Sequence, residues 1–240
     1  MAHCVGSLTF LMALTSGLKG VRSGIASALS WFPISTMANK IRADLDLGTA
    51  AAKAGLKSVT TDFDSQQFQD KFIDAVLKLF PSREQCTSAV CRRILGIYGD
   101  VYKHDQLNDA THKAIHEMFG IANLSAFNHI SRMVREGKAV DKHGKDVYLP
   151  HLDKVDIPIT FVHGAENNLF LPENTLKALK ALAAANSARA QLYTRIEFPN
   201  YAHMDCYIGK DASRDIYPSI IAELDRFNEA PSHARASGTR

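Results

Sequence analysis

The chain has 240 residues, of which 46% are apolar and 22% charged, and its formal net charge is +3 at pH 7. These values are typical of one globular unit with a sizeable core. The charge is small and spread evenly, which argues against binding to nucleic acid or to an anionic membrane surface, and no apolar run is long enough to span a bilayer.

The cysteines indicate a reducing environment. Cys4, Cys86, Cys91 and Cys206 are too few in a chain of this length for a disulfide framework, and no secretory signal precedes them. We therefore expect a cytoplasmic protein. Cys86 and Cys91 are close enough in sequence for a local bridge, and two ordinary thiols are the alternative.

The chain begins with a predicted nucleophile elbow. Cys4 has the small residues Ala2 and Gly6 two positions before and after it, and an apolar stretch follows over 7–14. Larger side chains at those two positions would collide in a tight strand-to-helix turn. The sulfur would lie at a helix N-terminus, which favours the thiolate, and the Val5 N–H would point where an oxyanion forms. Cys4 is the predicted nucleophile, and an inert buried thiol is the alternative.

Helices are predicted to dominate the middle of the chain. Small and β-branched residues over 21–30 predict a buried strand, and a polar turn at 141–146 closes the helical stretch. Apolar spacing and helix-stop signals predict helices at 36–45, 49–56, 68–80, 92–102, 109–118 and 126–135. We interpret 31–149 as a helical cap inserted after the first core segment, residues 1–30.

Strands and helices alternate after the cap. This alternation predicts a parallel sheet and therefore the α/β fold class. We expect the core to continue over 150–230 and a polar tail to occupy 231–240. The predicted elements are strands at 155–164 and 192–198 and helices at 176–185 and 217–227.

The loops after the last two strands hold the predicted partners of Cys4. In proteins with such an elbow, the chain order is nucleophile, orienting residue and histidine. His203 follows the strand at 192–198 and is the predicted base. Asn167 stands where the orienting acid usually lies, and Glu166 beside it is the alternative. A thiolate already paired with an imidazolium needs only an amide to hold the ring, so a Cys-His-Asn set is chemically coherent.

Other polar residues give weaker signals. His112 and His116 have the four-residue spacing of helical metal ligands, but no third ligand is evident, so we predict no metal site. His3 is expected to pack or to orient the turn. Asp205 is expected to accept local backbone N–H groups. Glycine-rich phosphate loops are absent, and we predict no cofactor in this chain.

Several segments together resemble one bacterial family. They are His3-Cys4-Val5-Gly6-Ser7, Cys91-Arg92-Arg93-Ile94, His104-Asp105-Gln106-Leu107-Asn108, Gly164-Ala165-Glu166-Asn167 and Tyr201-Ala202-His203-Met204-Asp205-Cys206. The family is the α/β-hydrolase domain that is joined to cholesterol-oxidase-like GMC (glucose-methanol-choline) flavin oxidoreductases, and the His203 segment is also similar to acid lipases. The resemblance implies a lipid, sterol-ester or acyl-thioester substrate.

The chain departs from the family pattern in two ways. Ala2 stands where the family usually has glycine, and the chain begins at the elbow, before which the family has further strands and a second oxyanion donor. We therefore expect an N-terminally truncated member that contains the C-terminal part of the hydrolase sheet, with the missing hydrolase half or the GMC domain as its partner. FAD would belong to that absent domain.

Two functions follow as expectations. The first is hydrolysis or acyl transfer on an ester or thioester: Cys4 attacks the carbonyl and His203 moves the proton, while Asn167 or Glu166 holds the ring and the Val5 N–H forms half of the oxyanion hole. The second is a C-terminal fragment of a bifunctional GMC oxidoreductase that is inactive, or only binds, on its own.

Overall fold

The computed structural model describes residues 1–37, 39–40, 57–64, 66–79 and 86–227. The helix predicted at 49–56, most of the one at 36–45 and the tail at 231–240 lie outside these residues. Within the described part, no helix is both long and apolar enough to cross a lipid bilayer.

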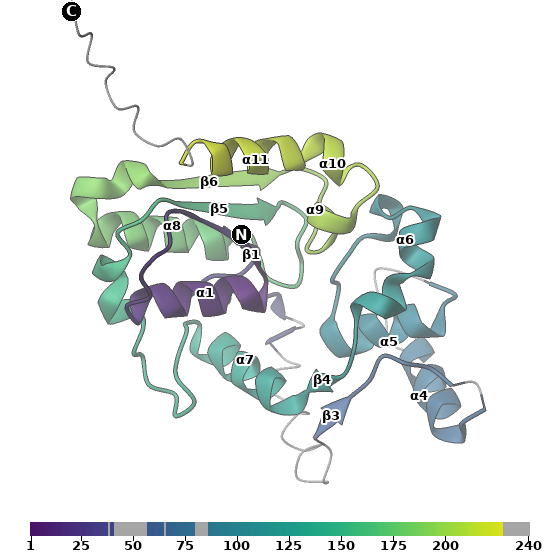
Figure 1. Ribbon diagram of the computed structural model, residues 1–240. Coiled ribbons are helices and arrows are strands. Elements are labelled where there is room, and N and C mark those ends of the chain that lie inside the picture. The colour runs from purple at the N-terminus through teal and green to yellow at the C-terminus, as the bar shows by residue number, and fades with distance from the viewer. Residues whose placement is uncertain (38, 41–56, 65, 80–85, 228–240) are drawn as a thin grey trace, which may run out of the picture.

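A four-stranded parallel sheet forms the centre of the molecule (Figure 1). The strands, in the spatial order β1-β2-β5-β6, are β1 (Ala2–His3), β2 (Gly24–Ser27), β5 (Ile159–Gly164) and β6 (Tyr193–Phe198). Ala26 of β2 pairs with Ala2 on one side and with Phe161 on the other. Helices connect the parallel strands, which confirms the predicted α/β class.

Helices cover both faces of this sheet (Figure 1). α1 (Val5–Thr15) and α8 (Glu173–Ala185) pack on one face, and α11 (Tyr217–Asp225) packs on the other. Successive strand residues face opposite layers: Phe161 belongs to the apolar cluster of α1 and α8, and Val162 to the cluster of α11. The central strands β2 and β5 are therefore buried on both sides, as is usual in parallel sheets.

A mostly helical part lies beside the sheet (Figure 1). Its helices are α4 (Phe68–Leu79), α5 (Ala89–Tyr98), η1 (His104–Gln106), α6 (Asp109–Lys113), η2 (Ile115–Met118) and α7 (Leu124–Glu136). A third apolar cluster lies in this part and includes Ile94, Tyr102 and Phe119, and Leu169 and Met204 from the sheet loops pack against it. The helical part therefore contacts the loops that follow β5 and β6.

Several boundaries differ from the prediction. β2 is shorter than 21–30 because Ala28 turns out of the strand at φ 67°. β5 begins only after Pro158, which has no N–H to donate to a neighbouring strand. The helix predicted at 109–118 divides into α6 and η2. The elements that the sequence does not predict are short: β3 (Ser58–Val59) paired antiparallel with β4 (Ala122–Asn123), η1, η3 (Leu149–Lys154), η4 (Ser187–Leu192), α9 (Asp205–Ile208) and α10 (Ala212–Asp215).

Candidate active site

The predicted site residues gather at one edge of the sheet. Cys4 follows β1, Asn167 follows β5 and His203 follows β6. Because the strands are parallel, their carboxyl ends meet at a single edge, where ligand sites of open α/β sheets lie. In Figure 1 the arrows of β5 and β6 point from the sheet toward α9 and the helical part.

Cys4 has the backbone conformation of a sharp strand-to-helix turn. Its φ is 52° and its ψ is −127°, and its N–H donates a hydrogen bond to the Ser27 carbonyl oxygen at 2.9 Å. A non-glycine residue in such a region costs about 1–3 kcal/mol and is typical of functional positions. The steric reason predicted for Gly6 is wrong within the described residues, because a Cβ there would have no atom within 4 Å.

His203 lies against this turn. Its ring centroid is 4.7 Å from that of His3, the residue before Cys4, and only 2% of its surface is exposed. The Tyr207 hydroxyl donates to Ser27 Oγ at 2.5 Å, and the Ser27 hydroxyl in turn donates to His3 Nδ1 at 3.2 Å. The structure thus brings His203 to the segment that carries Cys4, and His3 packs in the turn.

Asn167 contacts His203 with its amide nitrogen. Asn167 Oδ1 accepts the backbone N–H groups of Leu169 and Phe170, both at 3.1 Å, which fixes the orientation of the amide. Nδ2 then donates to His203 Nδ1 at 3.0 Å. The neutral ring must therefore carry its proton on Nε2, which is the reverse of the tautomer that a catalytic base needs.

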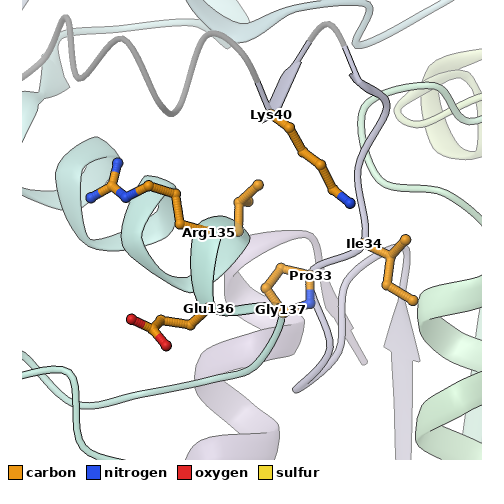
Figure 2. A pocket seen from close by; sticks show the side chains of 7 residues that line it. Pro33, Ile34, Lys40, Arg135, Glu136 and Gly137 are labelled. Atoms are coloured by element: carbon orange, nitrogen blue, oxygen red, sulfur yellow. The ribbon is translucent and has the colours of Figure 1, made fainter.

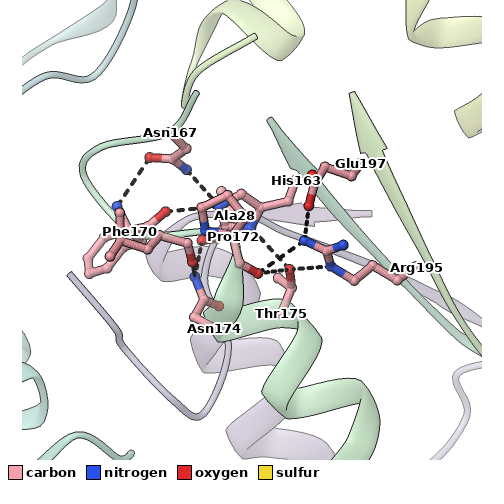
Figure 3. Close-up of polar contacts among 10 residues, drawn as sticks. Ala28, His163, Asn167, Phe170, Pro172, Asn174, Thr175, Arg195 and Glu197 are labelled. Atoms are coloured by element: carbon pink, nitrogen blue, oxygen red, sulfur yellow. Dashed lines mark hydrogen bonds and ion pairs between the residues drawn. The ribbon is translucent and has the colours of Figure 1, made fainter. Parts of the chain in front are cut away.

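A buried polar network holds Phe170, whose N–H donates to Asn167 (Figure 3). His163 Nε2–H donates to the Phe170 carbonyl oxygen at 2.9 Å, and the Thr175 hydroxyl reaches His163 Nδ1 at 3.2 Å. Arg195 Nε donates to Thr175 Oγ1 at 3.0 Å. Since His163 uses its Nε2–H on Phe170, it offers Asn167 no acceptor there. His163 is not among the predicted site residues, because a histidine at the end of an apolar strand carries no spacing signal.

The electrostatics of the site favour neutral groups. Burial raises the pKa of Cys4 to about 11, although the Val5 N–H donates a hydrogen bond to the sulfur and partly opposes the rise. Burial, with the positive charges that His3 and His163 would carry, holds the pKa of His203 well below its usual range. In this conformation burial therefore disfavours the expected thiolate–imidazolium pair and favours a neutral Cys4 thiol and a neutral His203 imidazole.

The acidic neighbours do not reach His203. Glu166, the alternative orienting residue, is half exposed and forms an ion pair with Lys103 at 2.8 Å. Asp205 is fully buried and accepts the Ala202 N–H at 2.8 Å, as predicted for a structural acceptor. Burial raises the pKa of Asp205 to about 6. Asn167 is therefore the residue that the structure brings to the ring of His203.

A pocket of about 210 Å³ lies elsewhere, between Pro33, Ile34 and Lys40 on one side and the end of α7 on the other (Figure 2). Its lining residues are Pro33, Ile34, Lys40, Val134, Arg135, Glu136 and Gly137. None of the predicted site residues lines it, and its volume is below the range usual for ligand sites. It gives no support to an acyl-binding role.

The structure distinguishes between the alternatives for the remaining thiols and histidines. All four cysteines are free, so Cys86 and Cys91 form no bridge. His116 is exposed and lies 3.8 Å from the Glu117 carboxylate, whereas His112 Nε2 lies 3.4 Å from Cys86 Sγ. The four-residue pair suggested by helical spacing is therefore not a site.

Comparison with known proteins gives matches at the level of structure only. No family model and no curated protein matches the chain. A monoacylglycerol lipase from Paleococcus ferrophilus is similar, with a TM-score of 0.52 and 12% identity over 94% of this chain and 66% of that one. A carboxyl esterase from Bacillus coagulans has a TM-score of 0.49 and 12% identity, covering 94% and 63%.

The chain therefore spans about two thirds of the length of these structures. The similarity to the lipase covers nearly the whole of this chain, and the parallel sheet with helices on both faces agrees with it. The chain has the architecture of the α/β-hydrolase fold.

Proposed function

We propose that the protein is an acyl hydrolase or acyltransferase that acts on esters or thioesters. Cys4 is the nucleophile, His203 carries the proton and Asn167 holds the ring of His203. The observation that carries this proposal is the Asn167–His203 hydrogen bond at 3.0 Å, beside the turn in which Cys4 has its strained backbone. These three residues come from the ends of three parallel strands of one sheet.

The proposed reaction begins with neutral partners. The Cys4 thiol gives its proton to His203 while the sulfur attacks the carbonyl carbon, and the Val5 N–H stabilises the resulting oxyanion. The carbon–oxygen or carbon–sulfur bond of the substrate then breaks, and His203 returns the proton to the leaving alcohol or thiol. Water or a second acceptor removes the acyl group from Cys4.

The orientation of the Asn167 amide opposes proton transfer to His203. His203 accepts a proton at Nε2 only when its own proton is on Nδ1, where Asn167 Nδ2 now donates. The base form therefore requires the Asn167 amide to turn and to release the N–H groups of Leu169 and Phe170. We expect slow chemistry near neutral pH for this reason.

The proposed substrate is an ester or thioester of a lipid or sterol. This choice rests on the family resemblance in the sequence and on the name of the similar structure, a monoacylglycerol lipase. A second candidate, binding of such a molecule without turnover, is favoured by the tautomer of His203 and by the raised pKa of Cys4.

Turnover of p-nitrophenyl butyrate and of a butyryl thioester separates the two candidates. We expect the wild-type chain to release product slowly, and we expect Cys4→Ala and His203→Ala to reduce the rate to background. His116→Ala, an exposed histidine outside the site, is the matched control and should keep the rate. Equal rates in all four proteins would contradict the catalytic proposal, and thioester binding without any turnover would favour the binding candidate.

A further inference from the structure

A second group of reactive side chains lies in the helical part. The nearest ligand atoms of Cys86, Cys91, His104 and His112 all lie within 4.8 Å of one another. They come from three segments: Cys86 precedes α5 and Cys91 lies in its first turn, His104 lies in η1, and His112 lies near the end of α6. We propose that these four residues bind a structural zinc ion, a site that goes beyond the proposed acyl chemistry and does not depend on it.

The ligand atoms lie close to, but not yet at, the spacing that a tetrahedral ion requires. Zinc lies about 2.3 Å from thiolate sulfur and about 2.0–2.1 Å from imidazole nitrogen, so its ligand atoms lie roughly 3.4–3.8 Å apart. Cys86 Sγ is 3.4 Å from His112 Nε2, and Cys91 Sγ is 2.9 Å from His104 Nε2. Small side-chain movements would place all four atoms around one centre. Two sulfur and two nitrogen ligands are a donor set that prefers zinc.

Neighbouring groups already hold the sulfur atoms. The Tyr102 hydroxyl lies 3.0 Å from Cys91 Sγ and the Ser88 N–H donates to Cys86 Sγ at 3.4 Å. Arg92 Nη1 donates to the Cys86 carbonyl oxygen at 2.7 Å, which positions the start of α5. Hydrogen bonds of this kind around a metal site orient the ligands and stabilise thiolate.

Binding would replace the two thiol protons. Zinc forms bonds to the sulfur atoms of Cys86 and Cys91 and to nitrogen atoms of His104 and His112, and the two protons are released to water. Four protein ligands close the coordination shell, which is typical of structural sites and leaves no position for a substrate.

The proposed ion would also hold a segment that is hydrogen-bonded to the loop of His203. Residues around His104 contact the His203 loop. The Met204 N–H donates to the Val101 carbonyl oxygen at 2.8 Å. Gln106 Nε2 donates to the Asn200 carbonyl oxygen, also at 2.8 Å. The segment that carries His104 is thus tied to the segment that carries His203.

Metal analysis of the purified full chain tests the proposal. We expect about one zinc ion per chain after dialysis against buffer with trace zinc. Cys86→Ser and His112→Ala should lower the zinc content at least about tenfold. His116→Ala is the matched control, because this histidine lies one turn beyond His112 and outside the cluster, and it should keep the zinc.

Cobalt substitution gives a readout that does not depend on how the variants fold. Cobalt(II) added to the metal-free wild-type chain should produce the visible bands of a tetrahedral site and a sulfur-to-cobalt charge-transfer band. Absence of both zinc and these bands in the folded wild-type chain would overturn the proposal. So would full zinc content in the folded Cys86→Ser and His112→Ala chains, or loss of zinc in His116→Ala.

Discussion

Asn167 Oδ1 accepts two backbone N–H groups, which leaves Nδ2 facing His203. An amide in this orientation cannot stabilise an imidazolium. A carboxylate in the same place would accept hydrogen bonds from the same two N–H groups and also from a protonated His203 Nδ1. The difference of one atom decides whether His203 is held neutral or can act as a base.

We predict that Asn167→Asp raises the rate of Cys4 alkylation near neutral pH. The new carboxylate favours the imidazolium, which in turn lowers the pKa of Cys4 from about 11. Such a nearby charge shifts a pKa by about 1–3 units, so the expected gain is about tenfold or more. Iodoacetamide labelling followed by mass spectrometry of the Cys4 peptide measures it. Asn167→Ala removes the amide without adding charge, and equal labelling of the two variants would show that the prediction is wrong.

The elements that carry these residues meet closely where β5 ends. A Cβ at Gly164 would overlap the backbone carbonyl oxygens of Tyr201 and Ala202, in the loop that leads to His203. By contrast, a Cβ at Gly6 in α1 would meet open space. The two glycines therefore have opposite roles: Gly164 is needed for packing and Gly6 is not.

Gly164→Ala should destabilise the protein by about 1–3 kcal/mol, because backbone must move to admit the methyl group. Gly6→Ala should stabilise it by about 0.5–1 kcal/mol, because alanine is the better helix former. Urea unfolding measures both changes, and the shared substitution makes each variant the control for the other. A Gly164→Ala protein as stable as the wild type would contradict the close approach of β5 and the His203 loop.

The sequence predicts the helices and strands better than it predicts the contacts between side chains. Strand patterns and chain order place Cys4, Asn167 and His203 at one edge, because those signals are local and parallel strands share an edge. The orientation of Asn167 depends on N–H groups fixed only by the folded loop. The contact between Cys86 and His112 joins residues 26 positions apart, so the local spacing of His112 and His116, from which no metal site was predicted, could not indicate it.

At the scale of the whole molecule, buried histidines should make the fold sensitive to acid. Burial lowers the pKa of His163 and of His3 from 6.5 to about 4, and it also holds the pKa of His203 well below its usual range. Between these values the unfolded chain binds protons that the folded chain does not, so stability falls as the pH falls from about 6.5 to about 4. The raised pKa of Asp205, about 6, acts in the opposite direction. The three histidines outweigh this single carboxyl group.

We expect His163 alone to contribute about 3 kcal/mol of this loss. Urea midpoints measured at several pH values should fall across this window, and His163→Gln, which cannot take up a proton, should show a smaller fall than the wild type. The same pH dependence in both proteins would contradict the burial of a neutral His163.

The most direct test of the whole account is the site of acylation. After reaction with a butyryl thioester and rapid acid quench, peptide mass spectrometry should find the butyryl group on Cys4, more of it in Asn167→Asp, and none in His203→Ala. Acylation of another residue, or acylation of Cys4 that persists unchanged in His203→Ala, would contradict the claim that these residues form one acyl-transfer site.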